Sequence, residues 1–328
     1  MAGTTKVQMK ITWGNCLTIL TINAADYLLY YPVSVFLKTG PLVACLPQPP
    51  CAETRETTTA GHAQLRPLAR QRKVDAIRCD LKLYEGECQM LSLRSINQFY
   101  GQNHILWDVD LDLPPGTCTG VLGQSGMGKT TLVNCIMGHL PINSGSMIWQ
   151  EANLPPQNLL LQPMEQRAAL GIGYVPQGRQ IFSQLSVEEN LQIALLAGAG
   201  HERHRAIPQM VYDLFPALYS LRHQRSGELM PDQQQQLALA RALVLKPKLL
   251  ILDEPTEGMS PWLEEEMGNL IHRLNHDFGL TILLLEQRIS FIRRVADYFL
   301  LLHRGRNVAH GRVAQLDERI INTWLTVT

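Results

Sequence analysis

The chain has no excess of either charge, since 29 lysines and arginines balance 29 aspartates and glutamates. A marked basic excess accompanies most nucleic-acid-binding proteins, so its absence predicts that nucleic acid is not a partner. The seven cysteines include no C-x-x-C pair. Their spacing therefore indicates neither a zinc site nor a disulfide framework.

Long apolar runs are also missing. The longest candidate, residues 16–36, is interrupted by Asn23, Asp26 and Pro32, whereas a membrane-spanning helix needs about 20 mostly apolar residues. The first residues do not follow the basic-then-apolar order of a secretory signal. If the protein works at a membrane, we expect it to sit there on partner subunits.

The character of the chain changes near residue 90 of its 328 residues. Residues 1–89 hold five of the seven cysteines and show no sustained helical or strand period. We predict that they form an N-terminal extension, either disordered or outside the functional protein, with translation beginning at Met90. The alternative is an unusual regulatory extension. We assign residues 90–328 to one α/β domain, because strand and helix patterns alternate there.

The pattern of apolar residues and turn signals predicts the elements of this second part. The expected strands are residues 90–96, 118–122, 171–175, 249–252, 281–285, 299–303 and 307–310. The expected helices are residues 186–196, 209–221, 232–244 and 261–275, with Pro231 at a favoured first-turn position. The four apolar residues at 249–252 are typical of a buried parallel strand.

A glycine-rich loop lies between one of these strands and a helical pattern over residues 132–139. Gly123, Gly128, Lys129 and Thr130 satisfy the pattern G-x-x-x-x-G-K-[ST]. Glycines let successive N–H groups point inward at phosphate oxygens, and the following helix adds its positive end. Lys129 can reach the β- and γ-phosphates, and the Thr130 hydroxyl can ligate Mg²⁺. This loop predicts that the protein binds ATP with Mg²⁺.

Two acidic residues follow the apolar run at 249–252. Asp253 would emerge at the carboxyl end of that strand, beside the phosphate site, and hold Mg²⁺ through water. Glu254 would orient and deprotonate the attacking water. The alternative is a surface acidic pair after a core strand, which the presence of the glycine-rich loop disfavours.

Further segments complete a family pattern. Residues 174–179 read Tyr-Val-Pro-Gln-Gly-Arg, residues 232–236 read Asp-Gln-Gln-Gln-Gln, and residues 252–256 read Leu-Asp-Glu-Pro-Thr. In this order, after the glycine-rich loop, they resemble the nucleotide-binding subunit of an ABC transporter. The resemblance covers residues 90–328 and is strongest to the branched-chain amino-acid and urea importers, the urea subunit above all.

The resemblance implies roles for residues that the pattern alone does not explain. Tyr100 matches the aromatic residue that stacks on adenine, a role that suits a phenol ring. Gln177 matches the glutamine that senses Mg²⁺ and leads into a helical subdomain near residues 182–245. Gln287 stands at the position of a histidine switch, and Ser260 replaces an inter-subunit aspartate, which puts that contact in doubt. The implied nucleotide-binding residues are Tyr100, Gly123, Gln124, Ser125, Gly126, Met127, Gly128, Lys129, Thr130, Thr131, Gln177 and Asp253. The implied Mg²⁺ residues are Thr130, Gln177 and Asp253, and the catalytic pair is Glu254 and Gln287.

The chain departs from the family at its signature sequence. The family has Leu-Ser-Gly-Gly-Gln at a helix start, whereas residues 229–233 read Leu-Met-Pro-Asp-Gln. Met230 lacks a hydroxyl, Pro231 lacks an N–H, and Asp232 would place a carboxylate near a triphosphate. The resemblance implies a fold with a RecA-like α/β core, an antiparallel β part and a helical insert.

It also implies partners: a second ATPase subunit, which we expect to be different from this one because of the altered signature, and membrane-spanning permease subunits that work with a solute-binding protein. The expected place is the cytoplasmic face of the inner membrane, and the expected solute is urea. The alternatives are a hydrolysis-impaired subunit, a branched-chain amino-acid importer ATPase, a soluble ABC ATPase and an unrelated P-loop kinase. His201 and His204 are interpreted as part of a solvated loop, because their H-x-x-H spacing is not that of the zinc motif H-E-x-x-H.

Overall fold

A computed structural model describes residues 6–13, 16–23, 89–152, 154–198 and 206–325. In the N-terminal extension, strands β1 (Lys6–Trp13) and β2 (Cys16–Asn23) pair antiparallel along their whole length. The sequence predicted no strand there. The prediction for residues 24–88 concerns residues outside the described part, as does the interpretation of His201 and His204.

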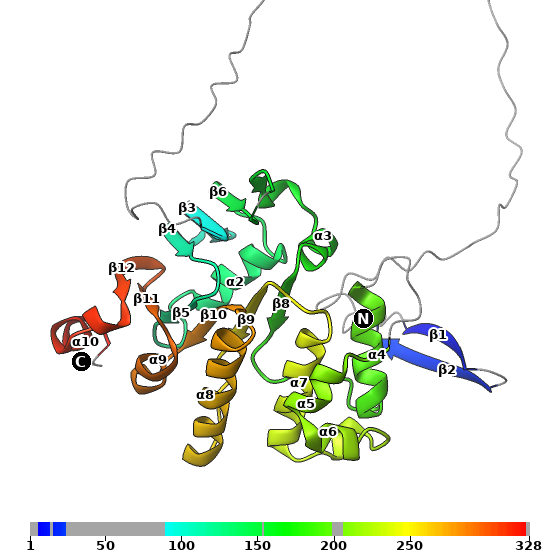
Figure 1. Ribbon diagram of the computed structural model, residues 1–328. Helices are drawn as coiled ribbons and strands as arrows, with labels where there is room; N and C mark the ends of the chain where they lie inside the picture. Colours follow the sequence, from blue (N-terminus) through cyan, green and yellow to red (C-terminus); the bar gives the residue numbers. More distant parts are fainter. Residues whose placement is uncertain (1–5, 14–15, 24–88, 153, 199–205, 326–328) are drawn as a thin grey trace, which may run out of the picture. The chain divides into compact units, whose positions relative to one another are not determined.

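The centre of the α/β domain is a six-stranded sheet, shown in Figure 1. All neighbouring strands are parallel except the pair at one edge, β12 and β11, which form an antiparallel hairpin. From that edge inward the strands are β12 (Arg306–Arg312), β11 (Tyr298–His303), β5 (Cys118–Leu122), β10 (Thr281–Glu286), β9 (Leu249–Asp253) and β8 (Ile172–Val175). The predicted strands at these positions are confirmed.

The central strands are buried on both faces, which explains their continuous apolar sequences. In β9, Leu249 and Ile251 belong to one hydrophobic cluster, whereas Leu250 and Leu252 belong to a second. Because side chains alternate across a strand, the two clusters lie on opposite faces of the sheet. Each face must therefore be covered by another layer.

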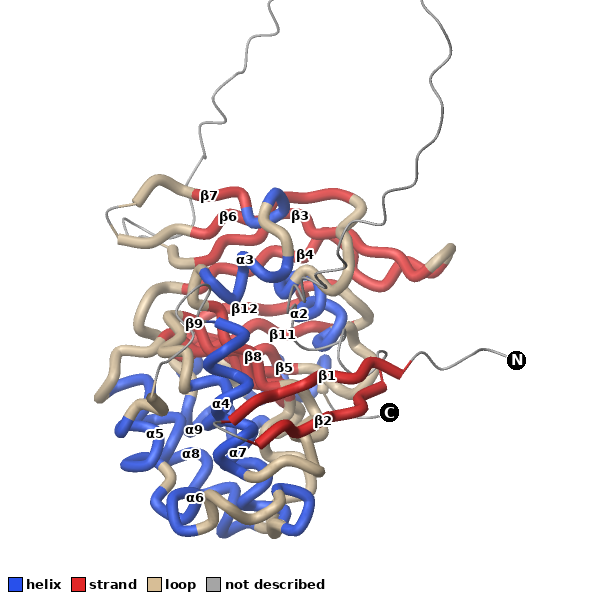
Figure 2. Tube along the Cα trace, turned by 90° about the vertical axis from the view of Figure 1, so that its right-hand side faces the viewer, coloured by secondary structure: helices blue, strands red, loops and turns tan. Residues whose placement is uncertain are grey.

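One layer contains α2 (Lys129–Met137) and a second, antiparallel sheet. Figure 2 shows this sheet on the side of the central sheet opposite to most helices. Its strands, in order, are β4 (Asn103–Leu113), β3 (Leu91–Tyr100), β6 (Ser144–Trp149) and β7 (Gln157–Asn158). Only β3 was predicted, and it extends four residues beyond the expected end.

The other face is covered by helices whose apolar residues form the second cluster. They are α4 (Val187–Gly198), α7 (Pro231–Leu243), α8 (Pro261–His276) and α9 (Ile289–Val295). All but α9 were predicted. The single helix expected over residues 209–221 is wrong, because Phe215 leaves the helical conformation and Pro216 begins a new helix. The two helices are α5 (Gln209–Leu214) and α6 (Pro216–Ser220).

Short elements complete the domain: α3 (Met164–Ala169), α10 (Glu318–Trp324) and the 3₁₀ turns η1 (Leu159–Leu161), η2 (Ser226–Glu228) and η3 (Val313–Gln315). The predicted α/β core, antiparallel β part and helical insert are thus all present. None of the helices in the described part of the chain combines the length and apolar composition that crossing a bilayer requires.

Candidate functional site

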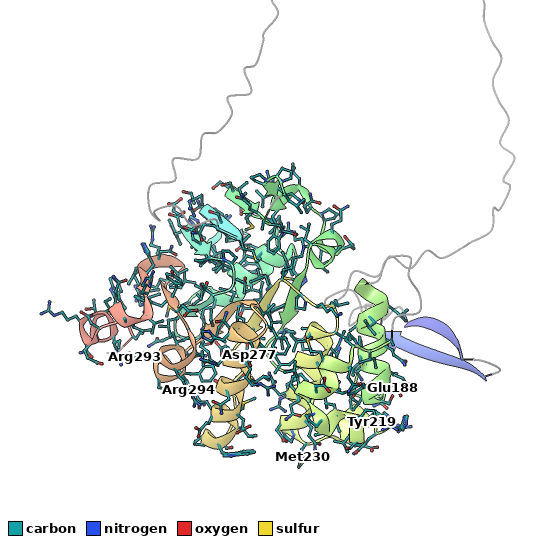
Figure 3. The ribbon with its side chains drawn as sticks, in the orientation of Figure 1. Glu188, Tyr219, Met230, Asp277, Arg293 and Arg294 are labelled. Atoms are coloured by element: carbon teal, nitrogen blue, oxygen red, sulfur yellow. The ribbon has the colours of Figure 1, made fainter. Side chains whose placement is uncertain are left out.

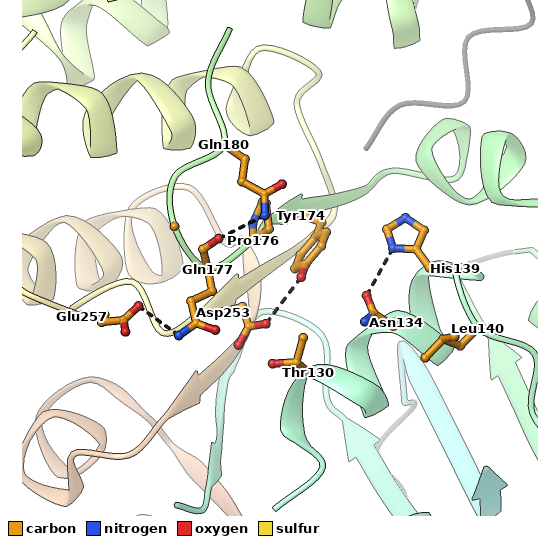
Figure 4. Close-up of a pocket in the computed structure, with 11 residues that line it drawn as sticks. Thr130, Asn134, His139, Leu140, Tyr174, Pro176, Gln177, Gln180, Asp253 and Glu257 are labelled. Carbon is orange, nitrogen blue, oxygen red and sulfur yellow. Dashed lines mark hydrogen bonds between the residues drawn. The ribbon is translucent and has the colours of Figure 1, made fainter. Parts of the chain in front are cut away.

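A pocket of about 540 Å³ lies where the carboxyl ends of β8 and β9 meet the first turn of α2. Figure 4 shows side chains from these elements and from the loops after the strands facing into it. The lining residues are Thr130, Asn134, His139, Leu140, Tyr174, Pro176, Gln177, Gly178, Gln180, Asp253 and Glu257. Ligands of open parallel sheets bind at this edge, so the pocket is the place to look for chemistry.

The glycine-rich loop joins β5 to α2 beside this pocket. A Cβ atom on Gly123 would lie 2.6 Å from the carbonyl oxygen of Leu302, so only glycine fits against β11. Gly128 caps α2 with a φ of +101°, a left-handed conformation that favours glycine. The loop therefore curls tightly and delivers the chain to a helix whose first N–H groups have no intrahelical partner. That arrangement binds anions.

Lys129, the first residue of α2, is buried within this loop. Its Nζ donates to the carbonyl oxygens of Gly123 at 2.7 Å and Gln124 at 3.0 Å. The same Nζ lies 3.0 Å from Oε1 of Glu254. The loop backbone thus holds the ammonium group in place, directly opposite the carboxylate that follows β9.

Glu254 is also contacted from the neighbouring strand. Nε2 of Gln287, the residue after β10, lies 2.9 Å from Oε1 and 2.8 Å from Oε2 of Glu254. A cation and an amide from two separate segments therefore orient one carboxylate. The structure thus brings together the two residues expected to be catalytic, Glu254 and Gln287. The sequence predicted neither this contact nor the ion pair with Lys129.

Asp253, the last residue of β9, is only 2% exposed. Burial raises the pKa of its carboxyl to about 6; the charge of Glu254 adds to this effect, and hydrogen bonds from Thr130 and Tyr174 and the charge of Lys129 oppose it. Its Oδ1 is buried and accepts no hydrogen bond from the described residues. A buried carboxylate oxygen without a donor, next to a threonine hydroxyl, suits a hard cation such as Mg²⁺.

Gln177 follows β8 and lines the same pocket as Thr130 and Asp253 (Figure 4). Its Nε2 donates to Oε2 of Glu257 at 3.0 Å. The structure therefore brings the three predicted Mg²⁺ residues to one pocket, but directs the Gln177 amide to Glu257, which is not one of the predicted residues.

Comparison with known proteins agrees with this geometry. Residues 106–257 match the family model described as ABC transporter. The LivF protein of Archaeoglobus fulgidus, a probable branched-chain amino acid transport ATP-binding protein, is 37% identical over 232 residues, 70% of this chain and 94% of the relative. The branched-chain amino acid transport ATP-binding protein BraG of Pseudomonas aeruginosa is 34% identical over 229 residues, 69% of this chain and 94% of the relative.

The chain belongs to the ABC transporter ATP-binding family. Among solved structures, the ATP-binding cassette MJ1267 aligns with a TM-score of 0.60 at 25% identity, over 69% of this chain and 92% of that one. The cbiO1 protein of Clostridium perfringens, part of the transporter complex cbiONQ, aligns with a TM-score of 0.60 at 25% identity, over 72% and 94%. The fold class is thereby confirmed: this is an ABC ATPase, and ATP hydrolysis coupled to transport is the family's activity.

The remaining predicted residues of this ABC ATPase lie on the glycine-rich loop or in the first turn of α2, except Tyr100, which lies in the antiparallel sheet. Ser125 and Gly126 are exposed at the tip of the loop, and Thr131 is half-buried in the first turn of α2. Met127 accepts hydrogen bonds from the turn of the β11–β12 hairpin. Tyr100 ends β3 and is 46% exposed, so its ring is free to stack on a planar group.

The altered signature residues form a sound helix start. Met230 is the N-cap of α7 and 58% exposed (Figure 3). Its backbone N–H donates to Oε1 of Gln233 at 3.1 Å. Pro231 occupies the first helical position and Asp232 the first turn, where both residue types are favourable. The departure from the family pattern therefore changes the side chains exposed at the start of α7 and leaves the start of the helix intact.

Two contributions to the site were missed by sequence reasoning. Glu257 carries a signal, as it is the third carboxylate of the run that begins at Asp253. No sequence pattern indicates the second contribution, which comes from the turn at Arg304 and Gly305. The Gly305 N–H donates to the carbonyl oxygen of Met127 at 3.1 Å, and the Arg304 N–H donates to the Met127 sulfur at 3.1 Å. The sequence predicted this hairpin but could not predict that it braces the glycine-rich loop.

Proposed function

We propose that this ABC ATPase hydrolyses ATP with Mg²⁺ at the site built on Lys129, Asp253 and Glu254, and so energises an importer of the branched-chain amino-acid type. The observation that carries the catalytic part is the contact of Glu254 with both Lys129 and Gln287. The names of the two relatives support the solute class. They favour a branched-chain amino acid over urea, the solute that we expected from the sequence.

Lys129, Glu254 and Gln287 would each have a separate role in ATP hydrolysis. The triphosphate would compete with Glu254 for the Lys129 ammonium, since phosphate oxygens carry more charge. Release of this ion pair would leave the Glu254 carboxylate oriented by the Gln287 amide alone. In that arrangement Glu254 accepts the proton of the attacking water.

Mg²⁺ would be held by Thr130 and Asp253, which already meet at the pocket edge. Few protein ligands are needed, because Mg²⁺ keeps several waters and takes the remaining oxygens from the phosphates. Its chemistry there would be to neutralise charge on the phosphate oxygens. Gln177 would join these ligands by giving up its hydrogen bond to Glu257. Tyr100 would stack on the adenine ring.

The altered signature favours a second candidate, an asymmetric pair. In this family each ATP site combines one subunit's glycine-rich loop with the other's signature. A partner with an intact signature would complete the site on Lys129, whereas the partner's own site would meet Met230, Pro231 and Asp232. We therefore propose a heterodimer with one competent site, bound to permease subunits at the cytoplasmic face of the membrane and served by a solute-binding protein.

Replacement of Glu254 by Gln tests the catalytic proposal. The amide keeps the shape of the side chain but cannot accept the proton, so ATP turnover should fall by about 100-fold or more while ATP still binds. Glu266→Gln, on the exposed face of α8, is the matched control and should keep full turnover. Undiminished phosphate release by Glu254→Gln would remove this residue from the mechanism.

The solute is tested in source cells that carry the Lys129→Ala variant in place of the normal gene. We expect loss of radiolabelled leucine uptake with unchanged urea uptake. The reverse result would assign the protein to urea import and withdraw the solute part of the proposal.

A further inference from the structure

A buried carboxylate lies directly behind the catalytic pair. Glu286 is the last residue of β10, is 3% exposed, and immediately precedes Gln287. Burial raises the pKa of this carboxyl, whereas hydrogen bonds from Thr256 and from nearby backbone N–H groups lower it. The role proposed above for Glu254 and Gln287 does not use this group.

The partners of Glu286 connect two separate segments. Its Oε1 accepts a hydrogen bond from the Thr256 hydroxyl at 2.6 Å and from the Thr256 N–H at 3.3 Å. Its Oε2 accepts from the Gln287 N–H at 3.1 Å. One carboxylate therefore joins the segment after β9 to the segment after β10.

Each of these segments carries one half of the catalytic pair. Thr256 lies two residues beyond Glu254 and is 1% exposed. Glu254 itself has a φ of +48°, an uncommon conformation for a non-glycine residue that its surroundings must maintain. Its N–H donates to the carbonyl oxygen of Leu285 at 3.0 Å, which is a second tie between the same two strand ends.

We propose that Glu286 is a positioning residue: through Thr256 and the Gln287 backbone it fixes the distance between the Gln287 amide and the Glu254 carboxylate. This inference rests on the proposed function, since it assumes that Glu254 activates water. Among the described residues, no hydrogen bond or ion pair joins Glu286 to the glycine-rich loop, whose Lys129 would hold the phosphates. Loss of the link should therefore lower kcat and leave ATP affinity and KM unchanged.

A matched pair of variants at Thr256 tests this. Thr256→Val keeps the shape of the side chain and removes the hydroxyl donor, whereas Thr256→Ser keeps the donor. In the transporter complex, we expect the valine variant to lose about tenfold or more in kcat, because small misplacements of catalytic groups are costly. The serine variant should recover most of that loss. Both should bind ATP as the unchanged complex does.

Glu286→Gln provides a second route if the valine variant does not fold. Its amide oxygen can still accept from Thr256, but its NH₂ group would face the Gln287 N–H, so kcat should again fall with unchanged ATP affinity. In the double variant of Thr256→Val and Glu286→Gln, the two losses in kcat should not add, because both substitutions break the same hydrogen-bonded link between Thr256 and Gln287. Full turnover in folded Thr256→Val or Glu286→Gln would overturn the proposal, as would additive losses or an equal loss of kcat and ATP affinity.

The failure of this inference differs from the failure of the proposed function. If the Glu254→Gln variant hydrolyses ATP at the normal rate, Glu254 is not the base, and both the proposed mechanism and the positioning role of Glu286 are refuted. If Glu254→Gln is inactive while folded Thr256→Val or Glu286→Gln is fully active, only the positioning role of Glu286 is refuted.

Discussion

Replacement of Asp253 by Asn should stabilise the protein in the absence of ATP and Mg²⁺. Burial raises the pKa of the Asp253 carboxyl from an ordinary value of 3.8 to about 6. A charged Asp253 is therefore disfavoured in the fold by roughly 2 pKa units, which corresponds to about 3 kcal/mol. The asparagine variant carries no charge at this position and can keep one acceptor oxygen for Thr130. Allowing for weaker hydrogen bonds, we expect a gain of about 1–3 kcal/mol in the free energy of unfolding at pH 7.5.

The sign of the pH dependence follows from proton binding. Between pH 3.8 and about 6 the folded protein binds more protons at Asp253 than the unfolded chain does. The unfolding free energy contributed by this group therefore falls as pH rises through that window and stays low above it. The gain in the free energy of unfolding from Asp253→Asn should be small near pH 3.8 and complete above about pH 6.

Urea denaturation at pH 5 and pH 7.5, with chelator and without nucleotide, measures this difference. Asp277→Asn, at the exposed end of α8 (Figure 3), controls for the loss of one negative charge and should change stability by no more than about 0.5 kcal/mol. A variant that is less stable at pH 7.5, or whose advantage is the same at both pH values, would refute the reasoning. Magnesium should protect the unchanged protein more than the variant.

Three further outcomes follow from the site. Lys129→Ala removes a charge-assisted contact worth on the order of 1.5–3 kcal/mol, so a direct titration should show at least tenfold weaker ATP binding; equal affinity would contradict the assignment of the loop. Replacing Met230, Pro231 and Asp232 by Ser, Gly and Gly should raise the ATPase rate and provide a serine N-cap for α7; no increase in a folded variant would mean that these residues are not limiting. Gly305→Ala should lower the free energy of unfolding by about 1–3 kcal/mol or more in a thermal melt. Its Cβ would lie 1.7 Å from a carbonyl oxygen of β4, at a φ of +74°; a melt like that of the unchanged protein would exclude this packing.

The sequence predicted best those features whose residues all lie in one contiguous segment. The glycine-rich loop, the apolar run of β9 and the acidic residues after it are each contiguous in the sequence. The end of β9 was predicted within one residue, whereas α2 begins at Lys129, three residues before the helical pattern expected from residue 132. Strands such as β4 and β6 were not predicted, because bulges and partial exposure break their alternation. Helix α5 and helix α6 were merged, because the apolar pattern continues across Pro216.

By itself, the sequence placed this chain among the ABC ATPases and predicted that it binds ATP through Lys129, Asp253 and Glu254. Only the tertiary structure decided their partners. The ion pair of Lys129 with Glu254 and the bridge from Glu286 to Thr256 join segments 125 and 30 residues apart. Such contacts depend on the order of strands in the sheet, which sets β9 beside β10 and places both next to the loop. No local periodicity encodes that order, because it is selected by the packing of two layers against the two faces of the sheet.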